Sequence, residues 1–276
     1  MTAVADRLPA HVAPSARQRL AWALGDMRVM TWRYLLQWVR LPQGIVFSTI
    51  QPVMFVLLFR YVFGGAIHPP RVNYVNFLMP GIILQTAAFG SIGTAIALAE
   101  DVSRGMIDRF RSLPMAHAAV LVGRVTADTV RNVFVVGLMI AVGYAVGFRF
   151  SNGAGAALGV VALALLVGLS FSLISACIGL ALKDAEAVQS FGLIWMFPLT
   201  FASSAFVPVA TMPWALRAFA EHQPVTAFVD ALRDLALGSD VTGHSTAHDV
   251  WLSLAWVAGI VVVFAPLAVR VYRRAA

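Results

Sequence analysis

Long apolar runs separated by short polar stretches dominate the chain from residue 44 onward. A helix needs about 20 mostly apolar residues to cross the hydrocarbon core of a membrane. The pattern therefore predicts an all-α membrane protein with six spans, at residues 44–66, 77–99, 132–148, 153–182, 187–209 and 250–271. An even number of spans places both chain ends on one side of the membrane.

The first forty residues are more polar and carry no signal-peptide pattern, because arginines interrupt every apolar stretch. Residues 1–15, with two prolines, are expected to form a disordered tail. In residues 16–41 apolar side chains recur on one helical face, beside arginines and three tryptophans. This pattern predicts an amphipathic helix lying in the membrane interface, and residues 16–276 are expected to form a single domain.

The composition supports an integral membrane protein: 60% of residues are apolar, 12% are charged and the mean hydropathy is +0.81. The lone cysteine, Cys177, excludes an intrachain disulfide. The net charge of +7 is explained by membrane topology without nucleic acid, since fifteen basic residues flank the predicted spans on the proposed cytoplasmic side and four lie outside. Both termini are therefore predicted to be cytoplasmic. The preference for arginine over lysine is typical of a GC-rich bacterial genome, which indicates the bacterial plasma membrane.

Arg60 is the one charged residue clearly inside a predicted span, the first. An ionisable residue in a membrane is a candidate for the substrate path. Its position six residues before Ala66 favours a side chain that reaches the outer interface.

The most distinctive stretch is residues 100–131, where charge recurs every few residues between two apolar runs. Charged side chains at this position are expected to stand in water and contact another protein, so the stretch predicts a cytoplasmic docking helix. Its second half, residues 115–131, is more sparsely charged and is expected to lead along the inner interface into the third span.

Residues 210–249 are too long for a simple turn and are broken by Pro213 and Pro224, which predicts short re-entrant helices before the last span. Asp230 and Asp234 are spaced like half of a magnesium-diphosphate site, but no second acidic cluster follows, so a solvated helix face is favoured. His244 and His248 are spaced for zinc but lack an intervening glutamate, and a polar loop is the preferred interpretation.

The chain lacks the residues for its own ATP site. A Walker motif needs a lysine between glycine and Ser or Thr, and the only lysine, Lys183, stands between Leu182 and Asp184. The predicted ranges of the six spans contain no Asp or Glu, which argues against a proton-driven carrier and leaves an ATP-independent channel or carrier as the alternative.

Two separated motifs carry a family resemblance. The first is GMIDRFRSLPM at residues 105–115, followed by Gly123, Arg124, Asp128 and Arg131 and then GFR at 147–149. The second comprises FVP at 206–208, MPW at 212–214, QPVT at 223–226 and ALR at 231–233, with Gly238. Together they resemble the permease subunits of type-two ABC exporters, and most closely the daunorubicin-resistance group.

The resemblance implies a permease that is not itself an enzyme and moves apolar or amphipathic compounds, such as drugs, antibiotics or lipids, out of the cell. Its partners would be separate ABC ATPase subunits, which hold ATP and Mg, and a second permease, identical or homologous; the chain itself would bind no cofactor and no metal. The resemblance also implies a coupling helix that contacts the ATPase, with contact residues Asp101, Arg104, Gly105, Asp108, Arg109, Phe110, Arg111, Leu113 and Pro114. It assigns the re-entrant segment to Pro208, Pro213, Pro224 and Arg233.

Overall fold

The computed structural model describes residues 15–40, 42–67, 69, 72–111, 118–238 and 241–274. Every regular element in these ranges is helical. The predicted disordered tail lies almost entirely outside them.

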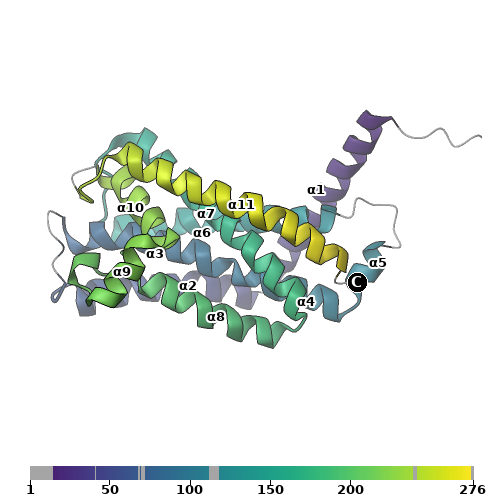
Figure 1. The fold of residues 1–276 in the computed structure, drawn as a ribbon, viewed down its shortest axis with the longest axis horizontal. Coiled ribbons are helices and arrows are strands. Elements are labelled where there is room, and N and C mark those ends of the chain that lie inside the picture. The colour runs from purple at the N-terminus through teal and green to yellow at the C-terminus, as the bar shows by residue number, and fades with distance from the viewer. Residues whose placement is uncertain are drawn as a thin grey trace, which may run out of the picture.

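The helices form an elongated bundle (Figure 1). In chain order they are α1 (Ala16–Arg40), α2 (Pro42–Leu58), a π-helix (Phe59–Phe63), α3 (Tyr74–Gly90), α4 (Ile92–Ser103), α5 (Met106–Arg111), α6 (Ala118–Ala145), α7 (Gly153–Leu182), α8 (Ala185–Phe201), a 3₁₀ turn (Val209–Thr211), α9 (Trp214–His222), α10 (Pro224–Leu237) and α11 (Thr246–Arg274).

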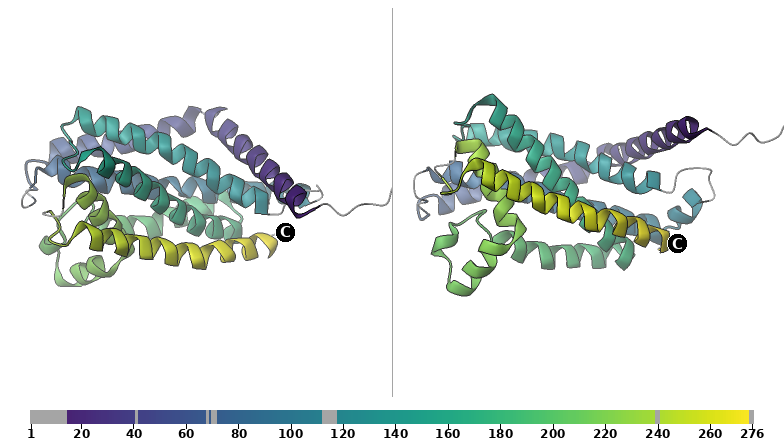
Figure 2. Two further views of the ribbon diagram at one scale, coloured as in Figure 1. Left: turned by 90° about the horizontal axis from the view of Figure 1, so that it is seen from above. Right: turned by 45° about the horizontal axis from the view of Figure 1, so that its top comes forward.

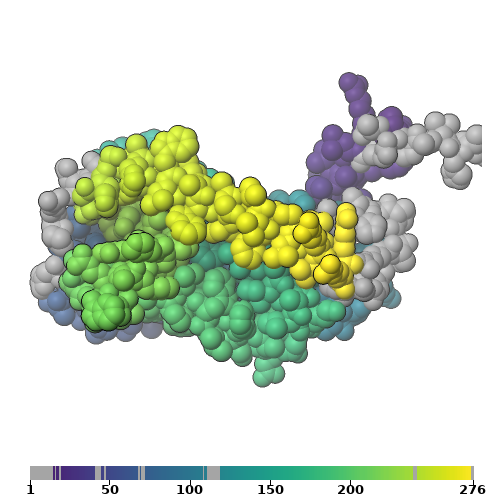
Figure 3. All heavy atoms as spheres, in the orientation of Figure 1, coloured from purple at the N-terminus to yellow at the C-terminus, as the bar shows by residue number. Residues whose placement is uncertain are grey.

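Different helices lie at the two ends of the bundle. Helix α5, the outward-projecting α1 and the end of α11 gather at one end, while α9 and α10 lie at the other (Figures 1 and 2). In the space-filling view α11 runs along one face, with α9 and α10 packed below its start (Figure 3). We call the end with α5 the docking end and the end with α9 and α10 the distal end.

Helix α7 packs against α3, α4, α6, α8, α10 and α11 and so forms the centre of the bundle. Its close approach to α4 depends on Gly179, because a Cβ at this position would overlap the backbone of Ala95. The helix ends at Lys183, whose backbone is left-handed with φ of 59°. The next residue, Asp184, caps α8 by accepting a hydrogen bond from the Ala187 amide at 2.7 Å.

Four helical stretches are long and apolar enough to cross a membrane: Tyr74–Ser103, Ala119–Ala145, Gly153–Leu182 and Thr246–Arg274. They contain the predicted second, fourth and sixth spans and most of the predicted third, since the second stretch ends at Ala145. The predicted first and fifth spans correspond to shorter helical stretches, α2 with its π-helix and α8.

The helix that contains most of the third predicted span begins earlier in the chain than that span. Residues 118–131, which belong to the segment expected to lead along the inner interface into that span, are the first half of α6. The longer helices also contain carboxylates, whereas the predicted ranges held none: Asp101, Asp128 and Asp249 lie within the four long stretches and are each at most 6% exposed. The argument from absent carboxylates therefore applies only to the shorter predicted ranges; in the longer helices each of these three groups is buried with a hydrogen-bond donor or a cation beside it.

Candidate functional site

Helix α5 is held at the docking end by a glycine turn and by apolar contacts. Gly105, with φ of 64°, separates α4 from α5 in a conformation that favours glycine. Ile107 is buried and Phe110 half-buried in a cluster that includes Met30 of α1 and Tyr272 of α11. Arg109 is exposed. The short helix is thus anchored on one face and presents at least one basic residue on another.

Asp101 links this segment to α1. Arg33 binds it through Nη2 and Oδ1 at 2.9 Å, and the Tyr34 hydroxyl donates to its Oδ2 at 2.6 Å. The Arg33 guanidinium also lies over the Phe110 ring, 5.2 Å from its centroid. Burial, reinforced by the Asp101 charge, raises the pKa of the Tyr34 hydroxyl, which therefore stays protonated and remains a donor. Asp101 is buried against α1, so it connects the end of α4, next to α5, to α1.

Charged side chains of α6 cover a break between α3 and α4. At the break the Thr94 amide donates to Ser91, three residues back, and the Gly90 carbonyl receives a hydrogen bond from Arg131 Nη2 at 2.6 Å. Arg124 Nη2 donates to the Gly93 carbonyl at 2.7 Å. Two arginines on the same face of α6 therefore satisfy carbonyl groups that an interrupted helix exposes.

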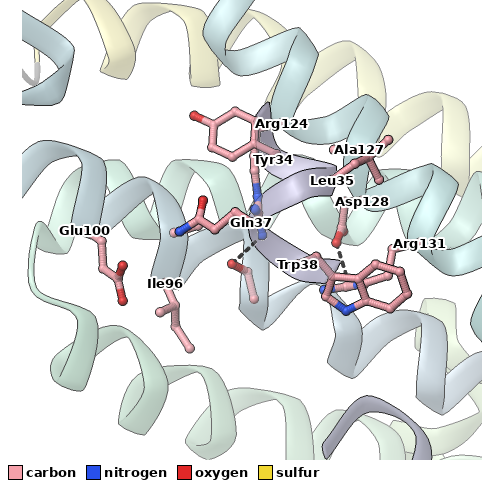
Figure 4. A pocket seen from close by; sticks show the side chains of 12 residues that line it. Tyr34, Leu35, Gln37, Trp38, Ile96, Glu100, Arg124, Ala127, Asp128 and Arg131 are labelled. Carbon is pink, nitrogen blue, oxygen red and sulfur yellow. Dashed lines mark hydrogen bonds and ion pairs between the residues drawn. The ribbon is translucent and has the colours of Figure 1, made fainter. Parts of the chain in front are cut away.

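Asp128 lies between these two arginines on the same face of α6 and is 2% exposed. It forms an ion pair with Arg131 at 2.5 Å and accepts a short hydrogen bond from Ser172 of α7. The close-up view shows Arg124, Asp128 and Arg131 facing Tyr34 and Trp38 of α1 (Figure 4).

These side chains line a cavity of about 270 Å³ between α1, α4 and α6, which we call the charged cavity. A second cavity of about 400 Å³ adjoins it and shares Trp38, Gly93, Ile96 and Arg131 in its wall. We call the second one the amide cavity, because its wall carries four carboxamides among aromatic rings: Gln51, Gln85, Asn132 and Gln189, with Phe55 and Phe89.

The distal end contains a second buried polar group. Arg233 is 2% exposed and binds Asp230 at 2.8 Å, the Ser204 carbonyl at 2.8 Å and the Phe77 carbonyl at 3.1 Å. Asp234 is 0% exposed and accepts a hydrogen bond from Thr242 at 2.8 Å. The expectation of a solvated helix face is therefore wrong: α10 packs against α3, α7 and α11, and its polar residues meet inside that contact.

The remaining candidate residues fall in three groups. Arg104 is exposed and pairs with Glu100, whereas the side chains of Asp108 and Arg111, and all of Leu113 and Pro114, lie outside the described part of the chain. Pro213 caps the start of α9, Pro224 is the first residue of α10, and Pro208 precedes the 3₁₀ turn. Arg60 is exposed in the π-helix and lines a separate cavity of about 390 Å³ with Tyr74 and Gly147.

Sequence reasoning missed the role of Arg33 and Tyr34, which looked like ordinary residues of an amphipathic helix. It placed Arg124, Asp128 and Arg131 in a motif, within the segment along the inner interface, but assigned no contacts to them. Their spacing of four and three residues, which puts all three on one helical face, was the available signal. Among the described residues no group of three metal-binding side chains comes together, and His244 instead lies 3.9 Å from Asp249.

Comparison with known proteins agrees with these features. A sequence profile described as ABC-2 type transporter matches residues 26–237. The daunorubicin resistance ABC transporter permease protein DrrB1 of Streptomyces coeruleorubidus is 31% identical over 274 residues, which cover 99% of this chain and 94% of that protein. The probable doxorubicin resistance permease DrrC of Mycobacterium tuberculosis is 28% identical over 264 residues, covering 95% and 93%. DrrB of the same species is 28% identical over 235 residues, covering 82% and 81%.

Proposed function

The chain belongs to the ABC-2 type transporter family, as a multi-pass permease without an ATPase domain, and we propose that it exports amphipathic drug-like compounds through the amide cavity. The names of its relatives, which refer to daunorubicin and doxorubicin resistance, support cargo of this chemical kind. Antibiotics and lipids of similar polarity are included in the proposed class.

The observation that carries this proposal is the size and lining of the amide cavity. Its volume of about 400 Å³ lies within the range of about 300 to 1,000 Å³ that is usual for small-molecule sites. Amide groups that donate and accept hydrogen bonds stand beside Phe55 and Phe89, which suits a compound with an apolar body and a few polar groups. Arg60, near the distal end, is a candidate for the outer part of the same path.

Energy would enter at α5. A separate ABC ATPase, with ATP and Mg bound to it, would contact this helix through Arg104, Asp108, Arg109 and Arg111, with Phe110, Leu113 and Pro114 shaping the contact. Movement of α5 would reach the cavity through α4, because Asp101 and the Gly90–Gly93 break both lie on the same α3–α4 stretch. A second permease, identical or homologous, would complete the transport path.

The proposed topology has six spans, with both termini on the cytoplasmic side of the bacterial plasma membrane. Three features support it: α1, α5 and the end of α11 share one end of the bundle (Figure 1), α2 and α8 are apolar, and basic residues predominate at that end. Helix α1 would lie in the inner interface. Helices α9 and α10 would form the re-entrant segment at the outer side, with Arg233 holding them to α3.

Transport by inside-out vesicles tests this function. The chain is co-expressed with an ABC ATPase encoded beside it, and uptake of a fluorescent amphipathic drug is followed with and without ATP. ATP-dependent uptake that disappears when the ATPase lacks its Walker lysine is the expected result. Uptake that is equal without ATP or without the ATPase would instead identify an ATP-independent channel or carrier.

A further inference from the structure

Two arginines, Arg124 and Arg131, and two carboxylates, Glu100 and Asp128, line the charged cavity, and of these four groups only Arg124 is in none of the described ion pairs. Around it the described ion pairs join Arg33 to Asp101, Arg104 to Glu100 and Arg131 to Asp128. Arg124 is in none of them: among the described residues no carboxylate oxygen lies within 4.0 Å of its guanidinium. Its positive charge is held by the Gly93 carbonyl and by the face of the Tyr34 ring, 5.1 Å away.

Two buried N–H groups in the wall of the charged cavity lack an acceptor. Arg124 Nε and Trp38 Nε1 are both shielded from solvent and have no hydrogen-bond partner among the described residues. A buried donor without an acceptor costs about 1–3 kcal/mol, so two in one cavity require an explanation. An anionic ligand with several oxygen atoms would supply both the acceptors and an ion-pair partner for Arg124.

An apolar surface continues from the cavity. The Trp38 ring packs edge-on against Phe134 of α6, with centroids 5.8 Å apart, and Phe134 is 51% exposed. Val130 and Val133 on the same helix are also about half exposed. A ligand in the cavity therefore has an apolar face beside it that is suited to hydrocarbon chains.

We propose that the charged cavity binds the phosphate head group of an anionic phospholipid, whose acyl chains lie along Phe134 and its neighbours. The proposal rests on the membrane topology described above, which places the docking end at the inner leaflet, and it does not depend on which cargo is exported. The lipid is a resident of the transporter. Its phosphate binds between α1 and α6, next to the contacts that brace α5, so that acidic lipid stabilises the docking end.

Lipid retention by the purified protein, measured by native mass spectrometry after exchange into equimolar phosphatidylglycerol and phosphatidylcholine, tests this site. The intact protein is expected to retain phosphatidylglycerol in preference to phosphatidylcholine. Arg124→Gln should lower that retention about tenfold, the effect of losing one charge-assisted hydrogen bond. Arg28→Gln, which removes an exposed positive charge elsewhere on α1, is the matched control and should leave retention unchanged.

Arg124→Gln could fail to fold for another reason, because Arg124 also binds the Gly93 carbonyl. A second variant therefore tests the same site without removing that contact. Trp38→Phe keeps an aromatic ring against Phe134 and removes only the N–H, and it should also reduce phosphatidylglycerol retention several-fold. Unchanged retention in folded Trp38→Phe protein, or equal retention of both lipids by the unmodified protein, would overturn the proposal. Displacement of the lipid by millimolar glycerol phosphate would overturn the lipid assignment in favour of a soluble phosphate.

Discussion

Arg233 offers the largest stability effect that the structure predicts. The side chain is 2% exposed, forms an ion pair with Asp230 and donates to two main-chain carbonyl groups on α3 and on the turn before α9. Its guanidinium also lies 3.8 Å from the centroid of the Phe77 ring. Replacing it by methionine keeps most of the volume and leaves a largely buried carboxylate without its cation.

Breaking a buried ion pair from one side costs about 3–5 kcal/mol, and an acceptor left unsatisfied adds about 1–3 kcal/mol. Asp230 keeps one donor, the Ser204 hydroxyl at 2.8 Å, and can relieve the rest by binding a proton. Burial already raises the pKa of Asp230. Arg233→Met should therefore lower the free energy of unfolding by about 3 kcal/mol or more at neutral pH, and by less at acid pH where Asp230 is protonated.

Reversible unfolding by a denaturing detergent, followed at two pH values, measures this difference. Asp230→Asn in the Arg233→Met background removes the unpaired charge and should recover much of the loss. A loss below about 1 kcal/mol at neutral pH, or no recovery in the double variant, would refute the assignment of Arg233 as the residue that holds α10 to α3.

Three further changes test other contacts. Burial raises the pKa of Asp234 to about 7, so stability should fall as pH rises from about 4 to about 7, and Asp234→Asn should remove this dependence in unfolding experiments; the charged or titratable groups around it are Asp230, Arg233, His244 and Asp249. Tyr34→Phe deletes the hydroxyl bound to Asp101 and should destabilise the fold by about 1–3 kcal/mol in the same assay. Gly179→Ala forces α7 away from α4 and should reduce the yield of folded protein in size-exclusion chromatography.

Elements defined by uninterrupted local signals could be predicted from the sequence. The fourth span was predicted with the bounds that α7 has, because an apolar run of thirty residues ends at the Lys183–Asp184 turn. Pro213 and Pro224 marked the starts of α9 and α10, since proline suits the first turn of a helix. The family followed from motifs in the polar segments.

The site depended on contacts that no local pattern specifies. The predicted third span was drawn to begin after Arg124, Asp128 and Arg131, because an unpaired charge in a membrane helix is costly. In the fold, Arg124 and Arg131 meet carbonyl groups at the α3–α4 break, and Asp128 meets Arg131 and Ser172. Apart from the Asp128–Arg131 pair on α6, these contacts join positions that are 31, 41 and 44 residues apart, so hydropathy alone could not reveal them.

The central claim, that ATP hydrolysis on a separate subunit drives transport through α5, is tested most directly by replacing Asp108 and Arg111 with alanine together. Drug uptake into inside-out vesicles is compared with the unmodified permease at equal membrane content, in the presence of ATP and the ATPase. The account predicts that ATP-dependent uptake is lost while membrane insertion and thermal unfolding are unchanged. Undiminished uptake by the double variant would contradict it.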